Sequence, residues 1–401
     1  MSESGGKSSP AVKVAIISVA LSICIMLLAV SVVQGFRREI RDKITGFDAH
    51  VTLYANMEDS PKGSIVRDAA LDSALRRLPF VTRIDYIASA PVLLKTKQAF
   101  KGVYMRGVDT GFDYSFLSSH LMAGRQPDRK KPAGSMREIL VSRSTARKLT
   151  LHPGDTVNTY LVSDELRARP MIVSGIFDTH FDAYDDYYIY GDIDVVQQMS
   201  GVSPEDISAV EITTADFSRL DEYLPQLTYA LNNAIDQGEI NQSFRLSTVL
   251  GQGANYFAWL DLLDTNVAII LVLMTLVAMF TLISGMLIII LEKVRFIGVM
   301  RALGLSRHKL RRIFVLLAVR IGLTGLLIGN GVALLIISLQ YFFHFIPLDA
   351  SAYFIDFVPV SLAPMPLVYI NLAFVCAIYL VLILPSQMAG RIRPSESMRF
   401  D

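Results

Sequence analysis

Four long apolar runs constrain this chain more than any other feature of its sequence. They cover residues 14–33, 267–291, 314–341 and 366–384. A helix needs about 20 consecutive apolar residues to cross the roughly 30 Å hydrocarbon layer of a bilayer. The 401-residue chain is 52% hydrophobic and only 19% charged, which is more apolar than an ordinary soluble domain. The runs therefore predict an integral membrane protein with four transmembrane helices.

The charges between these runs predict how the chain is oriented. The stretch 292–313 carries seven lysines and arginines against one acid, whereas the stretch 342–365 contains no lysine or arginine. By the positive-inside rule the first stretch is cytoplasmic and the second lies outside, which places residues 35–257 outside as well. One signal disagrees, because four basic residues follow the first run on its outer side: Arg37, Arg38, Arg41 and Lys43.

These assignments divide the chain into spans and connecting parts. We expect a cytoplasmic leader 1–13, a transmembrane helix 14–34, an extracytoplasmic domain 35–257, a second transmembrane helix 258–291, a cytoplasmic loop 292–313, a third transmembrane helix 314–341, an outer loop 342–365, a fourth transmembrane helix 366–385 and a cytoplasmic tail 386–401. Because the first and second helices flank the large domain, they connect it to the membrane on both sides.

The extracytoplasmic domain mixes strand and helix patterns without a strict alternation, which predicts an α+β fold. Strands are expected over 50–54, 83–94, 102–107, 138–141, 156–162, 170–177, 187–190 and 209–213. Helices are expected over 64–77, 144–149, 193–199 and 218–234. Asp216 is placed to cap the last of these helices.

The sequence shows no catalytic motif. No segment has the Gly-x-x-x-x-Gly-Lys-Ser/Thr spacing of an ATP-binding phosphate loop, and the six histidines are scattered. We therefore expect a protein that is not an enzyme, has no catalytic residues and holds no cofactor. With a net charge of +1 and no basic stretch interleaved with aromatic residues, no nucleic-acid partner is expected either.

The densest polar cluster runs from Asp178 to Asp186 and contains four carboxylates and His180. Carboxylates and imidazoles are metal ligands, but this spacing matches no calcium or zinc loop. A solvated turn anchored by neighbouring aromatic side chains explains the cluster better, so we expect no metal site.

The basic stretch 292–313 also contains an amphipathic helical pattern. The predicted apolar stripe consists of Val294, Ile297, Met300 and Leu303. Gly304 is placed to end this helix and Ser306 to cap the next one. Such a helix either rests on anionic lipid or docks into a groove of a cytoplasmic ATPase, and the pattern leaves both open.

The third run contains a Gly-x-x-x-Gly pair, Gly325 and Gly329, which permits the close approach of another helix. That helix belongs either to the same chain or to a second copy. Asn330 follows the pair and is costly in lipid, so we expect it to make a packing or functional contact inside the helix bundle.

Several motifs carry a family resemblance. One is Glu292-Lys-x-Arg-x-Ile-Gly-x-x-Arg-Ala-Leu-Gly-x-Ser306, followed by Arg311-Arg-Ile-Phe314. Another is the ending Pro385-Ser-x-x-Ala-Gly-Arg-Ile-Arg-Pro-Ser-Glu-Ser-Met-Arg-Phe400. Both resemble signatures of the MacB/FtsX/Lol class of ABC permeases, whose layout is also one span, a large domain and three spans. The segment Leu348-Asp-x-x-x-Tyr353-Phe-Ile-Asp356-Phe-Val-Pro-Val360 resembles the lipoprotein-releasing LolC/LolE branch.

This resemblance implies a multi-pass permease subunit of the bacterial inner membrane that releases acylated lipoproteins for transfer toward the outer membrane. Residues 35–257 would form a MacB-like periplasmic domain. The implied partners are a cytoplasmic ABC ATPase subunit, a second permease copy or a paralogue, lipoprotein cargo, a periplasmic lipoprotein chaperone and membrane lipid.

The resemblance also assigns residues to two contacts. The residues implied in coupling to the ATPase are Glu292, Lys293, Arg295, Ile297, Gly298, Arg301, Leu303 and Gly304. The family's chaperone-binding hook corresponds to a short hook segment: Leu161, Val162, Ser163, Asp164, Glu165, Leu166 and Arg167. Two other functions fit the same class, namely MacB-like mechanotransmission for efflux and FtsX-like signalling to a cell-wall hydrolase.

Overall fold

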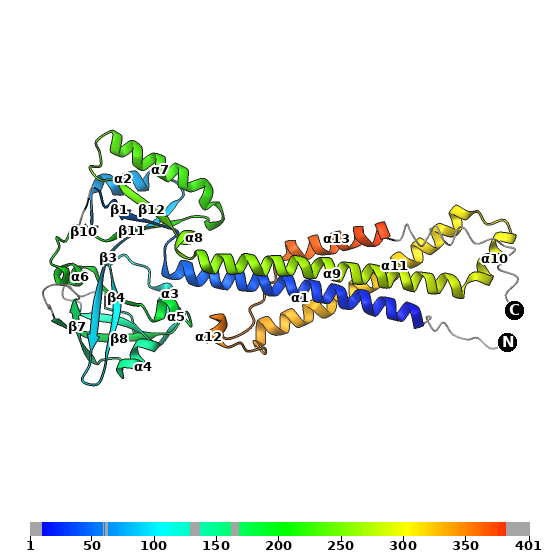
Figure 1. The fold of residues 1–401 in the computed structure, drawn as a ribbon, viewed down its shortest axis with the longest axis horizontal. Helices are drawn as coiled ribbons and strands as arrows, with labels where there is room; N and C mark the ends of the chain where they lie inside the picture. The colour runs from blue at the N-terminus through cyan, green and yellow to red at the C-terminus, as the bar shows by residue number, and fades with distance from the viewer. Residues whose placement is uncertain (1–9, 59, 61–62, 129–136, 162–167, 382–401) are drawn as a thin grey trace. The chain divides into compact units, whose positions relative to one another are not determined.

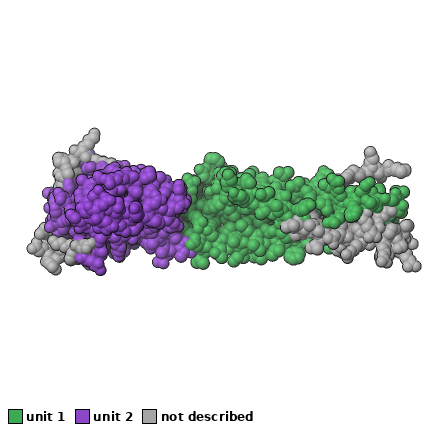
Figure 2. Space-filling model, turned by 90° about the horizontal axis from the view of Figure 1, so that it is seen from above, with its two compact units in different colours: residues 1–38, 259–347, 357–401 green, residues 39–258, 348–356 purple. Residues whose placement is uncertain are grey.

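The structure is a computed structural model that describes residues 10–58, 60, 63–128, 137–161 and 168–381. It divides into two compact units, which Figure 2 distinguishes by colour. Unit 1 comprises residues 1–38, 259–347 and 357–401, and unit 2 comprises residues 39–258 and 348–356. The helices α1 (Pro10–Phe47) and α9 (Ala254–Glu292) each contribute residues to both units.

Unit 1 consists mainly of apolar helices (Figure 1). They are α1, α9, α11 (Arg307–Phe343) and α13 (Pro364–Val381), with the short α10 (Val294–Ala302) between α9 and α11. Within the described residues, α1, α9 and α11 are long and apolar enough to cross a membrane. The apolar helix Pro364–Tyr379 is shorter. Since the predicted fourth span, 366–385, extends past the described residues, the count of four stays a prediction.

The glycine pair on α11 lies against α1 of the same chain. A Cβ added to Gly325 would stand 2.7 Å from the Val19 Cβ, and one added to Gly329 would stand 3.0 Å from the Ile23 Cβ. Both distances are too short for a side chain, and Val19 and Ile23 are fully buried. The close approach that the Gly-x-x-x-Gly spacing permits is thus made within one chain.

Asn330 makes its contact with α13. Its Nδ2 donates to the Asn371 Oδ1 at 2.7 Å, and the Asn371 Nδ2 donates back to the Asn330 Oδ1 at 2.9 Å. Each amide also donates to a backbone carbonyl of its own helix, Leu326 and Leu367 respectively. The polar group that is costly in lipid is therefore satisfied by a reciprocal pair between two helices.

The segment that precedes α13 packs along α1. The Ser31 Oγ donates to the Ser361 carbonyl at 2.7 Å, and the Ser361 N–H donates to the Ser31 carbonyl at 3.0 Å. At Gly35 the backbone of Pro359 comes so close that no Cβ would fit. This seam explains why a glycine stands at position 35 of a helix.

Unit 2 is a mixed α+β domain built on a large sheet. Its strands are β1 (Val51–Ala55), β2 (Ile65–Val66), β3 (Val81–Lys95), β4 (Phe100–Val108), β5 (Leu121–Gly124), β6 (Glu138–Ser142), β7 (Thr156–Leu161), β8 (Ala168–Phe177), β9 (Tyr188–Asp192), β10 (Asp206–Ile207), β11 (Ala209–Thr214) and β12 (Phe244–Thr248). Its other helices are α2 (Ala69–Arg76), α3 (Ser115–Ser119), α4 (Arg143–Leu149), α5 (Asp182–Asp185), α6 (Ile193–Ser200), α7 (Leu220–Asp236), α8 (Val249–Gln252) and α12 (Ala350–Tyr353), with a 3₁₀ turn at Phe217–Arg219.

Within the described residues, ten strands form one sheet in the order β12-β1-β11-β3-β4-β9-β6-β8-β5, and β7 pairs with both β3 and β8. The pairings from β3 through β4, β9, β6, β8 and β7 return to β3, so these strands close into a ring. The strands alternate buried and exposed residues, and the buried ones, such as Met105, Val157 and Met171, form the core. A two-stranded sheet, β2 with β10, completes the domain.

One predicted helix begins later than expected. The pattern predicts a helix over 64–77, but residues 65–66 form β2, which pairs with β10, and α2 begins only at Ala69. The reason is Asp68, whose side chain accepts a hydrogen bond from the Ala70 N–H and caps α2 there. The predicted cap at Asp216 is displaced: its carboxylate accepts from the Ser218 N–H at 2.8 Å and caps the 3₁₀ turn Phe217–Arg219, whereas α7 begins only at Leu220 and has no side-chain cap.

The packing of α11 on α1 can be tested with two neighbouring glycines. We expect Gly329→Val to lower the free energy of unfolding by about 1–3 kcal/mol, because an overpacked contact forces helices apart. Gly331→Val is the matched control, since no heavy atom lies within 4 Å of a Cβ placed there. Thermal unfolding of the purified chain in detergent measures both. Equal midpoints for the two variants would contradict the packing.

Candidate functional site

The helix α10 and its two ends form the first candidate site. Gly304 has a φ of +91°, a left-handed conformation that glycine adopts without strain, and the chain turns there. The Ser306 Oγ accepts a hydrogen bond from the Lys309 N–H at 3.4 Å and caps α11. The predicted helix end and the predicted cap are therefore confirmed.

The predicted apolar stripe of α10 is divided between two environments. Ile297 is fully buried in the core of unit 1, in the same cluster as Leu310 and Phe314, and Gly298 is buried as well. Leu303, by contrast, is 77% exposed. In this arrangement the buried Ile297 side chain positions α10 against its own chain, whereas the Leu303 side chain is exposed.

A second apolar face of α10 points outward. Phe296 and Val299 are about half exposed and, together with Leu303, recur at steps of three and four residues, so they share one side of a helix. We call these three residues the outward face of α10. The implied coupling residues Glu292, Lys293, Arg295 and Gly304 are exposed too, whereas the side chain of Arg301 is not among those described.

The sequence analysis missed Phe296 and Val299. Two overlapping apolar stripes run along this helix, and the 296, 299, 303 spacing was present in the sequence. Only the burial of Ile297 decides which stripe faces the protein and which faces outward.

The hook segment connects two antiparallel strands. β7 and β8 pair antiparallel from Thr156 opposite Ile172 to Tyr160 opposite Ala168. Leu161 ends β7 and is buried. The other hook residues, 162–167, lie outside the described residues.

The polar cluster at 178–186 is held by ion pairs and hydrogen bonds. The Arg143 Nη1 lies 2.9 Å from the Asp178 Oδ2, and the Lys101 Nζ lies 2.9 Å from the Asp186 Oδ1. Asp178 and Asp185 also line a cleft of about 220 Å³ that Arg143 borders. Among the described residues, no group of three or more His, Cys, Asp or Glu side chains could hold a metal ion.

Asp185 is the buried member of this cluster. Its carboxylate accepts from the Thr179 N–H at 3.0 Å and from the Thr179 Oγ1 at 2.8 Å, and it is 2% exposed. Burial raises the pKa of this carboxyl to about 6, although the bonds from Thr179 lower it, and the charges of Asp178 and Asp182 raise it further. This carboxyl therefore titrates near pH 6, above its ordinary value of 3.8.

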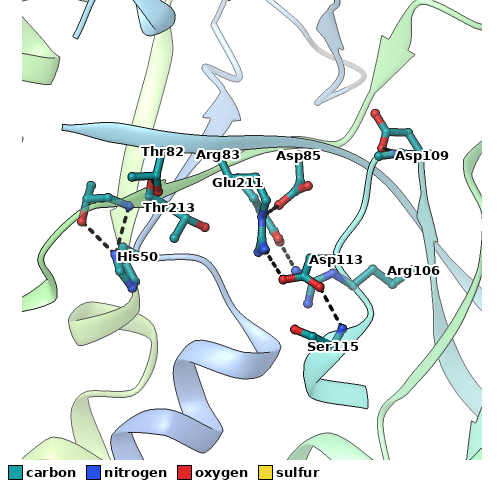
Figure 3. A network of polar contacts seen from close by, with 12 residues as sticks. His50, Thr82, Arg83, Asp85, Arg106, Asp109, Asp113, Ser115, Glu211 and Thr213 are labelled. Carbon is teal, nitrogen blue, oxygen red and sulfur yellow. Dashed lines mark hydrogen bonds and ion pairs between the residues drawn. The ribbon is translucent and has the colours of Figure 1, made fainter. Parts of the chain in front are cut away.

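A buried arginine anchors the carbonyl end of α1 in unit 2. The Arg106 side chain on β4 is almost fully buried, and its Nη1 donates to the Phe47 carbonyl at 2.6 Å. Its Nη2 donates to the carboxylate of Glu211 on β11, which Figure 3 shows beside it. Because a helix carries partial negative charge at its carbonyl end, a cation is favourable there.

A second ion network lies next to this anchor. Arg83 on β3 bonds Asp85 at 2.6 Å and Asp113 at 3.0 Å, and Asp113 also accepts from the Ser115 N–H (Figure 3). These contacts join the sheet to α3. They have the geometry of a structural network, because every charged group named has a partner.

Family models match both parts of the chain. One described as MacB-like periplasmic core domain matches residues 14–243, more than half of the chain. Another described as FtsX-like permease C-terminal matches residues 268–394.

Two curated relatives align over nearly the whole chain. The lipoprotein-releasing system transmembrane protein LolC of Xylella fastidiosa is 24% identical, over 96% of this chain and 93% of its own length. The corresponding LolE of Haemophilus influenzae is 23% identical over the same shares. Among solved structures, the periplasmic region of MacB from Actinobacillus actinomycetemcomitans matches at 12% identity and a TM-score of 0.37, covering 54% of this chain and 96% of that one.

The raised pKa of Asp185 predicts a pH dependence of stability. The folded state holds a proton on Asp185 up to about pH 6, whereas the unfolded state loses it near the ordinary value of 3.8. The contribution of Asp185 to the free energy of unfolding is therefore fully present below pH 3.8, and it is lost as the pH rises through about 6. Between about pH 7.5 and pH 5 we expect the wild-type chain to gain more thermal stability than Asp185→Asn, which does not titrate. The same gain in both chains would show that Asp185 does not titrate as stated.

Proposed function

Because this chain belongs to the MacB-like periplasmic core domain family and is an ABC permease of the MacB/FtsX class, we propose that it releases acylated lipoproteins from the inner membrane for transfer toward the outer membrane. The observation that carries this proposal is the alignment with lipoprotein-releasing LolC and LolE proteins over 96% of this chain. The alignment includes both the domain and the apolar helices, so it supports a shared mode of action rather than a shared module.

A separate ATPase subunit would bind the outward face of α10. Phe296, Val299 and Leu303 present apolar surface between exposed basic residues, which suits a groove in a protein partner. Ile297 would hold the helix in place from the other side, because it is buried in the core of unit 1. A nucleotide-driven movement of the ATPase would then reach the apolar helices through α10.

A second permease copy or a paralogue, together with lipid, would cover α9. Only 11% of the most apolar 18-residue stretch of α9 is buried in this chain, compared with 44% of the corresponding stretch of α1. The exposed side chains on α9 include Ile269, Val272, Leu276 and Phe280. Acyl chains of the cargo need an apolar path, and the face of α9 provides one that leads along a membrane-spanning helix.

The domain and its hook segment would act on the periplasmic side. A soluble lipoprotein chaperone would bind at the hook segment that connects β7 and β8, which pair antiparallel. The chain itself would be a multi-pass protein of the inner membrane. A MacB-like efflux role is the second candidate, because the family model that covers the domain is MacB-like.

A reconstituted system tests the proposal. The chain is purified with the ATPase subunit and any permease paralogue that it retains, and inserted into liposomes with a mature triacylated lipoprotein. We expect ATP to drive the lipoprotein into the soluble fraction when a periplasmic chaperone is present. ATP hydrolysis without any transfer of lipoprotein would leave the efflux role as the better explanation.

Substitutions on α10 test the coupling role. We expect Phe296→Ala combined with Leu303→Ala to weaken ATPase binding by about tenfold or more, because exposed apolar anchors carry most of the energy of such interfaces. Phe100→Ala on β4 is the matched control, since Phe100 is an exposed phenylalanine of unit 2 to which no binding role is assigned. Co-purification of the ATPase measures binding. Equal binding by the double variant and the wild-type chain would remove α10 from the interface.

A further inference from the structure

A buried lysine joins three distant parts of the chain in unit 2. Lys43, near the end of α1, is 6% exposed. Its Nζ donates to the Thr179 carbonyl at 2.6 Å and to the Phe354 carbonyl at 2.7 Å, and these residues are 136 and 311 positions away in sequence. A buried ammonium group loses its hydration and needs such acceptors. The carboxylates of Asp185, Asp178 and Asp356 also interact with it electrostatically.

The backbone is strained at both carbonyls that Lys43 binds. Phe354 itself has a φ of +62°, and His180, which follows Thr179, has a φ of +57°. Residues other than glycine rarely adopt this left-handed backbone conformation, and it persists only where surrounding contacts enforce it. Both strained residues can relax if the bonds to Lys43 break. Strain placed in this way is typical of segments that switch between two states.

An aromatic contact and an exposed polar contact complete the junction. The Phe354 ring meets Phe181 edge to face, with centroids 5.1 Å apart, and meets Tyr256 of α9 at 5.8 Å. The His180 Nε2 lies 3.5 Å from the Asp356 Oδ1. The Asp356 side chain is 57% exposed, so water screens this pair and it adds little resistance to separation.

The residues of this junction lie close in sequence to the points where the chain passes from one unit to the other. The chain passes between unit 1 and unit 2 within α1, within α9, and on either side of residues 348–356. Lys43, Tyr256 and Phe354 each lie within a few residues of one of these passages.

We propose that Lys43, His180 and Phe354 form a latch that fastens the segment 348–356, within the predicted outer loop 342–365, to the domain and opens during each transport cycle. The opening part of this proposal rests on the proposed permease function, whereas the fastening part does not. In the closed state the two Lys43 bonds hold loop and domain together. In the open state the loop and the 178–186 turn separate and the backbone at Phe354 and His180 relaxes.

Hydrogen exchange on the full-length chain tests the fastening. We expect Lys43→Met to speed exchange of the Leu348 and Tyr353 amides by about tenfold or more, because their bonds within the loop lose external support. Lys43→Arg retains a cation and should restore part of the protection. Lys101→Met is the matched control: Lys101 is also buried and binds Asp186 of the same turn, but has no bond to the loop. Unchanged exchange in Lys43→Met, or equal acceleration in Lys101→Met, would overturn the latch.

Reversible cross-linking tests the opening. His180→Cys and Asp356→Cys are introduced together in a chain whose native cysteines, Cys24 and Cys376, are replaced by alanine and serine. A short reducible bis-methanethiosulfonate then ties loop to domain, and a monofunctional methanethiosulfonate on the same variant is the control. We expect lipoprotein release to fall by about tenfold or more in the cross-linked complex only, and to return on reduction.

Three outcomes are informative. Undiminished release by the cross-linked complex would overturn the opening of the latch. Equal loss with the monofunctional reagent would do the same, because the effect would then come from modification rather than from the tether. If neither the wild-type chain nor the untreated variant releases lipoprotein, the proposed function fails and the opening part fails with it, while the exchange data still decide on the fastening part.

Discussion

The bond between the Arg106 guanidinium and the last carbonyl of α1 fixes how the domain is built on its first helix. Arg106 stands on β4 in the middle of the sheet, and it reaches Phe47 on α1 and Glu211 on β11 together. Removing one partner of such a buried pair leaves an uncompensated charge, which costs far more than an exposed ion pair is worth. The end of α1 is therefore part of the core of unit 2 rather than a flexible connection.

The part of α1 in unit 1 is also held by packing and hydrogen bonds. Val19 and Ile23 pack against the glycines of α11, and Ser31 exchanges two hydrogen bonds with Ser361. α1 is one uninterrupted helix from Pro10 to Phe47, so both sets of contacts involve the same helix. α9 differs, because little of its apolar surface is covered by this chain. This contrast makes α9 the helix with the larger exposed apolar surface.

Much of the architecture could be predicted from sequence, because it depends on local patterns. Hydrophobic patterning predicted the main strands, and local chemistry predicted the helix end at Gly304 and the helix cap at Ser306. The start of α2 was misplaced because a cap at Asp68 and a short β pairing outweigh the helical pattern of residues 64–68. The β5 and β12 strands went unpredicted, since pairing with β8 and β1 rather than their own patterns defines them.

The site could be predicted only in part, because burial depends on distant residues. Lys43 looked like one of several basic residues that contradict the positive-inside rule, yet it is buried between two carbonyls more than a hundred residues away. Arg37, from the same group, lies 3.0 Å from Asp261 and 2.8 Å from Asp264 on α9. Acidic side chains thus balance the charge of Arg37, which the positive-inside rule counts without regard to such partners.

The most direct measurement of the central claim is the location of a major lipoprotein in cells depleted of this protein. Inner and outer membranes are separated after conditional depletion, and the mature lipoprotein is quantified in each. The account predicts that it accumulates in the inner membrane as the chain disappears. Normal delivery to the outer membrane under full depletion would contradict the releasing role.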